Sequence, residues 1–321
     1  MEKRPAHVER APASIDGQPA TRLIVVLRAI GCAWARQPHG GCTNCGFLGL
    51  STGGATVATS DLIAQIDYVL DRQENIDGVA EIDIYNSGSF LSDVEIPPPV
   101  REHCFRRLAS LPIRRVVVES RPEYISAAKL ASLRLLLGAR ELEIGIGLES
   151  ANDHVREALI NKGFTRADFT RAVAVIAASS TRLLAYVLVK PLGLDERTAI
   201  ADAVSTVSYV FDVAAAHGVT ARVALQPVFV APGSALERAY LAGDYRPPSL
   251  WSVVEVLRKT HQLGELLVGL SDESLSPRQA PAGCDRCSGD LRTAIQKYNR
   301  RRDLAVLDAI DCPLCREDSG R

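Results

Sequence analysis

This 321-residue chain lacks long apolar runs, which would indicate membrane spans, and a large net charge, which would favour a polyanionic partner or a membrane surface. No uninterrupted apolar run approaches the roughly 18 residues that cross a bilayer. The first 21 residues are polar and rich in proline and alanine, without the apolar core of a signal peptide. With a formal charge of −1, no overall positive field favours nucleic acid or membranes. We therefore expect a cytoplasmic protein that does not contact membranes and begins with a flexible arm over residues 1–21.

The chain also lacks internal repeats and low-complexity tracts, and its 47% hydrophobic residues can build a substantial core. From residue 22 to about residue 264, short β-branched runs alternate with amphipathic helical stretches, which indicates repeated βα units and a parallel sheet. This pattern favours an α/β fold, an incomplete (β/α)6 barrel over residues 22–274, with a doubly wound open sheet as the alternative. The expected strands are Arg22–Leu27, Ala80–Tyr85, Arg115–Glu119, Glu141–Leu148, Leu183–Lys190 and Ala221–Phe229, with a further short strand-like run at Leu266–Leu270.

Seven of the eight cysteines fall into tight groups, which favours metal binding over disulfides in a chain with a real core. Cys32, Cys42 and Cys45 follow the first strand with the spacing Cx9CxxC. Three thiolates bind three irons of a [4Fe–4S] cubane and leave the fourth iron open. S-adenosylmethionine can chelate that iron and receive an electron. The alternatives are a zinc site completed by His39 or a set of buried structural thiols.

The second group, at the C-terminal end, consists of two CxxC pairs separated by 24 residues: Cys284, Cys287, Cys312 and Cys315. Four thiolates suit one tetrahedral zinc ion, and an auxiliary iron–sulfur cluster is the alternative. Residues 275–321 are therefore expected to form a small metal-stapled extension. Cys104, alone in an expected helix, is interpreted as an ordinary packed thiol.

Several segments beyond the cysteines match a known family. They are Gly31-Cys32-Ala33-Trp34 with Gly41-Cys42-Thr43-Asn44-Cys45-Gly46-Phe47, Tyr85-Asn86-Ser87-Gly88-Ser89-Phe90-Leu91, Val118–Ile125, Gly145–Asp153, Ile160–Phe164, Tyr245–Ser252 and the two CxxC motifs. In these segments the chain resembles the radical S-adenosylmethionine (radical SAM) superfamily, and within it the archaeosine-synthase radical SAM lyase family and its bacterial relatives. The cluster loop is also similar in spacing to that of the Elongator catalytic subunit. The resemblance implies a partial, TIM-like (β/α)6 barrel.

The resemblance also assigns cofactor contacts to strand ends. It implies that Asn86, Ser87, Gly88 and Ser89 bind the amino group of S-adenosylmethionine, and that Gln226 and Val228 lie where backbone contacts adenine. Glu149 would accept the ribose hydroxyls, or alternatively cap the following helix. Lys162 would bind the methionine carboxylate as a point charge, or alternatively be a solvated lysine at a helix end.

Three further charged residues are candidates for catalysis. Glu119 and Arg121 follow the third expected strand and Lys190 the fifth, so all three can project towards substrate or cofactor. A mutual salt bridge at the barrel mouth is the alternative for this trio.

The function implied is reductive cleavage of S-adenosylmethionine to a 5′-deoxyadenosyl radical, with an electron donor such as flavodoxin or ferredoxin. The first hypothesis is a small-molecule nucleoside or nucleotide substrate, as in carbon–carbon bond formation during assembly of an antibiotic such as tunicamycin. The second is a tRNA-modifying lyase of the archaeosine type. A polyanion needs several basic contacts, and Arg292, Lys297 and Arg300–Arg302 offer the one patch, balanced by acids. The third is a non-enzymatic iron–sulfur or zinc interaction module.

Overall fold

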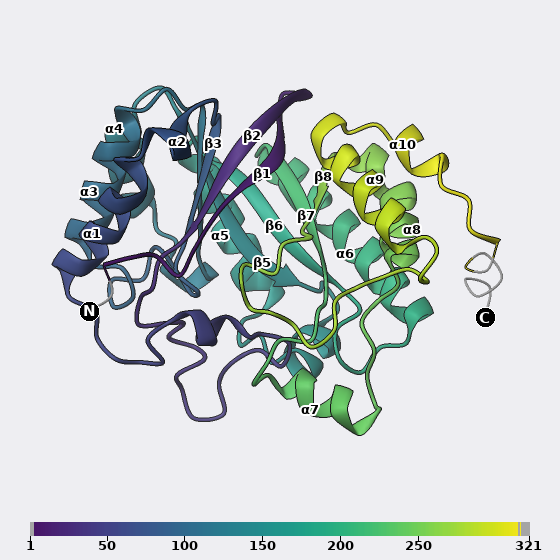
Figure 1. Ribbon diagram of the computed structural model, residues 1–321. Coiled ribbons are helices and arrows are strands. Elements are labelled where there is room, and N and C mark those ends of the chain that lie inside the picture. Colours follow the sequence, from purple (N-terminus) through teal and green to yellow (C-terminus); the bar gives the residue numbers. More distant parts are fainter. Residues whose placement is uncertain (1–2, 314, 316–321) are drawn as a thin grey trace.

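The computed structural model describes residues 3–313 and residue 315. Eight strands form one curved sheet in sequence order, with helices along its outer face (Figure 1). All neighbouring strands are parallel except the first pair. The strands are β1 (His7–Ile15), β2 (Gln18–Val26), β3 (Glu81–Tyr85), β4 (Arg115–Glu119), β5 (Glu141–Glu149), β6 (Arg182–Val189), β7 (Ala221–Pro227) and β8 (Glu265–Val268).

The helices follow the strands in the expected alternation. The α-helices are α1 (Thr59–Leu70), α2 (Gln73–Ile76), α3 (Pro98–Ala109), α4 (Ala127–Leu137), α5 (Arg166–Ala178), α6 (Glu196–His217), α7 (Ala235–Ala242), α8 (Leu250–Thr260), α9 (Ser288–Arg301) and α10 (Ala305–Asp308). Short 3-10 turns are η1 (Phe47–Leu50), η2 (Pro122–Tyr124) and η4 (His261–Leu263), and η3 (His154–Leu159) is a π-helical turn. The partial barrel predicted from the βα alternation is confirmed, and its six expected strands correspond to β2–β7.

Most of the expected flexible arm of residues 1–21 is instead strand β1 and the beginning of β2, so that expectation is wrong for these residues, while residues 1–2 lie outside the described part of the chain. β1 pairs antiparallel with β2 along its whole length, from His7 opposite Val26 to Ile15 opposite Gln18. Asp16 and Gly17 connect them, both with positive φ (50° and 74°). Two left-handed residues give the tight turn that matches strand twist, and Asp-Gly is a favoured pair for it. The Asp16-Gly17 pair is a sequence signal for this hairpin, but the high proline and alanine content of residues 1–21 favoured an irregular arm instead.

The barrel interior is layered. Alternate residues of the parallel strands face inward, and Ile24, Val26, Val117, Leu184 and Leu267 form an apolar cluster there. Towards the amino-terminal ends of the strands lies a layer of buried charges. Arg222 contacts Glu81 at 2.9 Å and Arg115 contacts the same carboxylate at 3.2 Å, all three at most 1% exposed. The carboxyl-terminal side is left open for the site.

Helix α9 closes the gap between the two edges of the sheet, where it packs against β1, β2 and β8. The side chain of Asn299 replaces a ninth strand: it accepts a hydrogen bond from the backbone N–H of Val268 (2.9 Å) and donates to the carbonyl of the same residue (2.7 Å). Arg302 and Arg292 donate to the carbonyls of Leu266 and Leu270. The described part of the C-terminal extension therefore completes the barrel wall.

Within the described residues, one helix, α6, is long and apolar enough to cross a membrane by length and composition alone. It packs against α8, α5 and strands β6 and β7, as an outer helix of the barrel does.

Candidate active site

A cavity of about 250 Å³ opens at the carboxyl ends of the strands, where the three cysteines of the first group line it together. Cys32, Cys42 and Cys45 lie in the long loop after β2, and burial raises the pKa of the Cys42 thiol although the Lys162 ammonium opposes this shift. His39, the alternative fourth ligand of a zinc site, is exposed and does not line the cavity in the part of the chain that the structure describes. Three thiols around one open cavity fit a cubane with a vacant iron.

The loop after β5 holds the cysteine loop in place. The Trp34 indole N–H donates to the Asn161 carbonyl (2.9 Å), and the Asn161 amide donates to the Gly41 carbonyl (2.8 Å). Thr43 donates through its backbone N–H to Ile160 (2.9 Å). Sequence analysis did not assign a role to Asn161, which has a positive φ of 58°. The segment Ile160–Phe164 is thus both a clamp for the cysteine loop and the source of Lys162.

Glycines are required where the loop folds on itself. A Cβ at Gly40 would collide with the Trp34 carbonyl, and Gly41 has a φ of 92°. At Gly88 a Cβ would collide with the Glu95 carboxylate and come within 2.9 Å of Cys32 Cα. The backbone of Gly88 therefore lies directly against Cys32.

Glu95, which sequence analysis missed, ties these two segments together. Its buried carboxylate accepts hydrogen bonds from the backbone N–H of Ala33 (2.9 Å), the backbone N–H of Ser89 (2.5 Å) and the Asn86 amide (3.1 Å). Burial raises its pKa, and the backbone donors counter that effect. Glu95 lies in the loop between β3 and α3, away from the strand ends, so a search for functional residues at strand ends does not find it.

The four residues at the end of β3 divide into two pairs. Ser87 and Gly88 line the cavity, and within the described residues the Ser87 hydroxyl has no hydrogen-bond partner. Asn86 and Ser89 do not line the cavity: Asn86 donates to Glu95, and the Ser89 hydroxyl accepts from the Arg121 backbone N–H (3.1 Å). Two of the four are thus placed to touch a ligand and two support the turn.

Glu149 and Lys162 both line the cavity and form an ion pair of 2.7 Å. Burial lowers the pKa of Lys162, but the charge and hydrogen bond of Glu149, together with nearby Cys42, outweigh this effect and the pKa rises. The helix after β5 is capped by the Asn152 side chain, which accepts from the backbone of His154 and Val155. Glu149 is therefore free of the capping role that was its alternative.

Glu119, Arg121 and Lys190 do not come together as a trio. Glu119 lines the cavity, and burial, with Glu273 nearby, raises the pKa of its carboxyl to about 8. Arg121 also borders the cavity, but its guanidinium pairs with Glu123 and donates to the carbonyls of Lys162 and Gly163.

Lys190 pairs with Glu196 at the start of α6 (2.6 Å) and does not line the cavity in the described structure. The expected projection of this lysine towards the site is therefore wrong in this structure, because its left-handed backbone (φ 63°) places the side chain over Glu196 and Tyr245. Gln226 and Val228, in contrast, both line the cavity at the end of β7.

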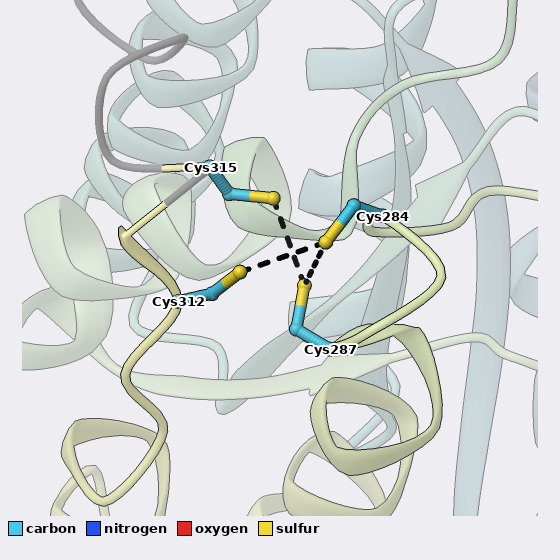
Figure 2. A group of neighbouring side chains, drawn as sticks. All are labelled: Cys284, Cys287, Cys312 and Cys315. Atoms are coloured by element: carbon cyan, nitrogen blue, oxygen red, sulfur yellow. Dashed lines mark hydrogen bonds between the residues drawn. The ribbon is translucent and has the colours of Figure 1, made fainter.

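The second cysteine group forms one compact site at the amino-terminal end of α9, which begins directly after Cys287 (Figure 2). The Cys284 sulfur lies 3.6 Å from that of Cys287 and 3.5 Å from that of Cys312, and Cys287 lies 3.7 Å from Cys315. Thiolates at about 2.3 Å from one tetrahedral zinc ion would lie about 3.8 Å apart. Cys104 is fully buried in α3, as the interpretation of a packed thiol requires.

Comparison with known proteins places the chain in a class. The fold matches the archaeal Elp3 of Methanocaldococcus infernus (TM-score 0.50, 14% identity, 76% of this chain and 59% of that one). It also matches SuiB of Streptococcus suis bound to S-adenosylmethionine (TM-score 0.51, 10% identity, 78% and 51%). With the relatives that follow, this fold and the cysteine loop define a radical SAM enzyme.

The sequence relatives narrow the class further. The archaeosine synthase beta subunit of Methanosarcina acetivorans is 30% identical over 305 residues, covering 94% of this chain and 85% of the relative. That of Thermococcus kodakarensis is also 30% identical, over 312 residues, covering 95% and 92%. No protein-family model matches. The chain belongs to the family of the archaeosine synthase beta subunits.

Proposed function

We propose that this radical SAM enzyme acts on a nucleoside-type substrate, with a free nucleoside or nucleotide as the first candidate. The observation that carries the proposal is the single cavity that joins Cys32, Cys42 and Cys45 to Ser87, Gly88, Glu149 and Lys162. When bound there, a [4Fe–4S] cluster supplies an electron for cleaving S-adenosylmethionine into methionine and a 5′-deoxyadenosyl radical. A protein electron donor such as flavodoxin or ferredoxin would serve in the cytoplasm.

The chain's own residues would bind and orient the cofactor. The Ser87–Gly88 backbone would receive its amino group, Lys162 its carboxylate, Glu149 the ribose hydroxyls, and the β7 end at Gln226 and Val228 the adenine. The 2.7 Å pair of Glu149 and Lys162 would open on binding. Lys162 would exchange the Glu149 carboxylate for the methionine carboxylate, and Glu149 would accept hydrogen bonds from the neutral ribose hydroxyls instead.

The structure weakens the one basic patch that would favour tRNA. Arg302 is held by Glu265 and the Leu266 carbonyl, and Arg292 donates to the Leu270 carbonyl. Lys297, Arg300 and Arg301 remain exposed on α9. Three cations on one helix make a smaller phosphate footprint than a typical site of six to ten contacts.

A tRNA substrate, with a partner subunit, is the second candidate because the relatives are named archaeosine synthase beta subunits. The type of reaction depends on the substrate: a tRNA substrate would fit cleavage of a bond, and a free nucleoside would fit formation of a carbon–carbon bond.

The spacing of the second cysteine group supports a single tetrahedral zinc ion there. Sulfurs 3.5–3.7 Å apart suit four ligands of one ion, whereas ligands of a cubane bind separate irons and stand farther apart.

Anaerobic incubation with S-adenosylmethionine and dithionite tests the proposal, with 5′-deoxyadenosine measured by chromatography. A panel of free nucleosides and nucleotides is compared with total tRNA, and the proposal expects at least tenfold stimulation by a member of the free panel. Stimulation by tRNA alone would establish the second candidate. If protein with intact clusters forms no 5′-deoxyadenosine, the proposal fails, and the hypothesis of a non-enzymatic iron–sulfur or zinc interaction module is favoured.

A further inference from the structure

Two tyrosines form a hydrogen-bonded pair in the wall of the active-site cavity. Tyr85 at the end of β3 and Tyr186 in β6 both line the cavity, and their hydroxyl oxygens lie 3.0 Å apart. β3 and β6 are separated by two strands in the sheet, so the contact spans the barrel interior. Aromatic residues make up only 5% of the chain.

The pair leads to a buried acid. The Tyr85 hydroxyl lies 3.3 Å from Asp83 Oδ2, which also accepts from Arg22 at 3.0 Å. Asp83 is fully buried, and among the described residues its second oxygen, Oδ1, has no hydrogen-bond partner. Burial and the neighbouring Glu81 raise the pKa of this carboxyl to about 7. In this arrangement the Tyr186 hydroxyl donates to Tyr85 and the Tyr85 hydroxyl donates to Asp83. A proton held on Asp83 can therefore return to Tyr186 when both hydroxyls turn.

The Tyr186 ring has room to pack against the neighbouring strand β5 because residue 145 there is glycine. A Cβ at Gly145 would lie 3.0 Å from the Tyr186 hydroxyl oxygen and ring edge. The ring thus packs over bare backbone, with its hydroxyl in the cavity that holds the cluster cysteines. Apart from those cysteines and the two tyrosines, the described lining contains no readily oxidised side chain: it has neither tryptophan nor methionine.

A purely structural bridge is the alternative for such a pair. A bridge needs no oxidisable group, however, and a carbon radical formed in this cavity would attack a phenol O–H within reach. In a radical enzyme, two phenols at this point would either take part in the reaction or quench the carbon radical by giving it a hydrogen atom.

We propose that Tyr186 is a catalytic residue that donates a hydrogen atom to a carbon radical in the cavity, with Tyr85 and Asp83 as positioning residues that restore it. The inference rests on the proposed function, since it needs a radical to be formed. In the step, the Tyr186 O–H bond breaks and a C–H bond forms, leaving a Tyr186 phenoxyl radical. That radical takes one electron from the same low-potential reductant that serves the cluster. It takes a proton from Tyr85, which is reprotonated by Asp83 and, through it, by solvent.

Isotope labelling tests this without a known substrate. Reconstituted enzyme is incubated anaerobically with S-adenosylmethionine and dithionite in D2O, so that every tyrosine hydroxyl carries deuterium, and 5′-deoxyadenosine is analysed by mass spectrometry. Tyr186→Phe is compared with the parent and with Tyr209→Phe, a matched control on α6 whose hydroxyl contacts Thr170.

The parent and Tyr209→Phe should give singly deuterated 5′-deoxyadenosine, and Tyr186→Phe should lose at least tenfold of that label. Tyr85→Phe should keep the label but prolong a phenoxyl signal in freeze-quenched electron paramagnetic resonance, a signal that ring-deuterated tyrosine narrows. Equal labelling in the parent and Tyr186→Phe, or no label in the parent, would overturn the inference. If no 5′-deoxyadenosine forms, the proposed function fails first.

Discussion

Single residues at the cavity mouth show how closely the cluster loop is packed. Gly88 lies against both Glu95 and Cys32, and a methyl group there has no space. Gly88→Ala should therefore displace the cysteine loop and lower the iron content of reconstituted protein by at least half. Gly49→Ala is the matched control, because a Cβ at Gly49 meets nothing within 4 Å. Iron analysis of both variants checks this, and equal iron contents would show that the loop tolerates the methyl group.

The partly buried carboxyl of Glu119 should make stability depend on pH. Its pKa in the folded protein is about 8, above the value of about 4.3 in an unfolded chain. The folded state then binds more protons than the unfolded state between these values, so stability falls as pH rises through this window. Glu119→Gln should remove that loss.

The gain in unfolding free energy from Glu119→Gln should grow by about 1–3 kcal/mol between pH 6 and pH 8.5, at about 1.4 kcal/mol per pKa unit. Anaerobic urea denaturation at the two pH values measures it. A gain that is the same at both would mean that Glu119 titrates normally.

At the scale of elements, helix α9 stands in for a missing strand. Asn299 satisfies both backbone groups of Val268, and no apolar side chain can do so. Asn299→Leu should lower the unfolding free energy by about 1–3 kcal/mol per backbone group left unpaired. Gln296→Leu, at an exposed position of the same helix, should change it by less than about 0.5 kcal/mol. Similar losses in the two variants would show that Asn299 acts only through helix propensity.

Elements with regular patterns could be predicted from the sequence. β2–β7 were found because buried parallel strands are short β-branched runs followed by helices, and the cysteine loop because its spacing is specific. β1 was missed because its alternating residues include two alanines and a proline. The role of α9 could not be predicted, because the hydrogen bonds of Asn299 and Arg302 to the backbone of edge strand β8 produce no periodic pattern in the sequence.

The site could be predicted only in part, for a similar reason. Residues at strand ends, such as Glu149 and Gln226, were assigned from the family resemblance, and their common position at one rim agrees with the topology, since strand ends meet there. Glu95 and Asn161 act through backbone contacts between distant loops, which no local pattern encodes. Lys190 was misplaced because its position predicts the rim but not the direction of its side chain.

For the whole molecule, the amino-terminal half of the barrel interior is held by charge where such barrels are usually filled by apolar layers. Glu81 lies between Arg115 and Arg222, and Arg222 also contacts Glu143. Burial raises the pKa of Glu81, but the two guanidinium groups outweigh it and hold it below its usual value.

Glu81→Gln should destabilise the protein by about 3–5 kcal/mol, because it leaves buried guanidinium charge uncompensated. Glu102→Gln, which breaks only the exposed pair with Arg106, should cost less than about 1 kcal/mol. Thermal unfolding of both variants against the parent compares them. A Glu81→Gln protein as stable as the parent would mean that the charge layer contributes nothing net.

The proposed chemistry of the whole protein depends on a cluster that Cys32, Cys42 and Cys45 would hold at the mouth of the cavity. The most direct test is electron paramagnetic resonance of anaerobically reconstituted, reduced protein with and without S-adenosylmethionine, for the parent, Cys42→Ala and the packed-thiol control Cys104→Ala. The parent and Cys104→Ala should show a reduced [4Fe–4S] signal that changes when S-adenosylmethionine is added, and Cys42→Ala should lose it. A signal that does not change when S-adenosylmethionine is added, or that is still present in Cys42→Ala, would contradict the account.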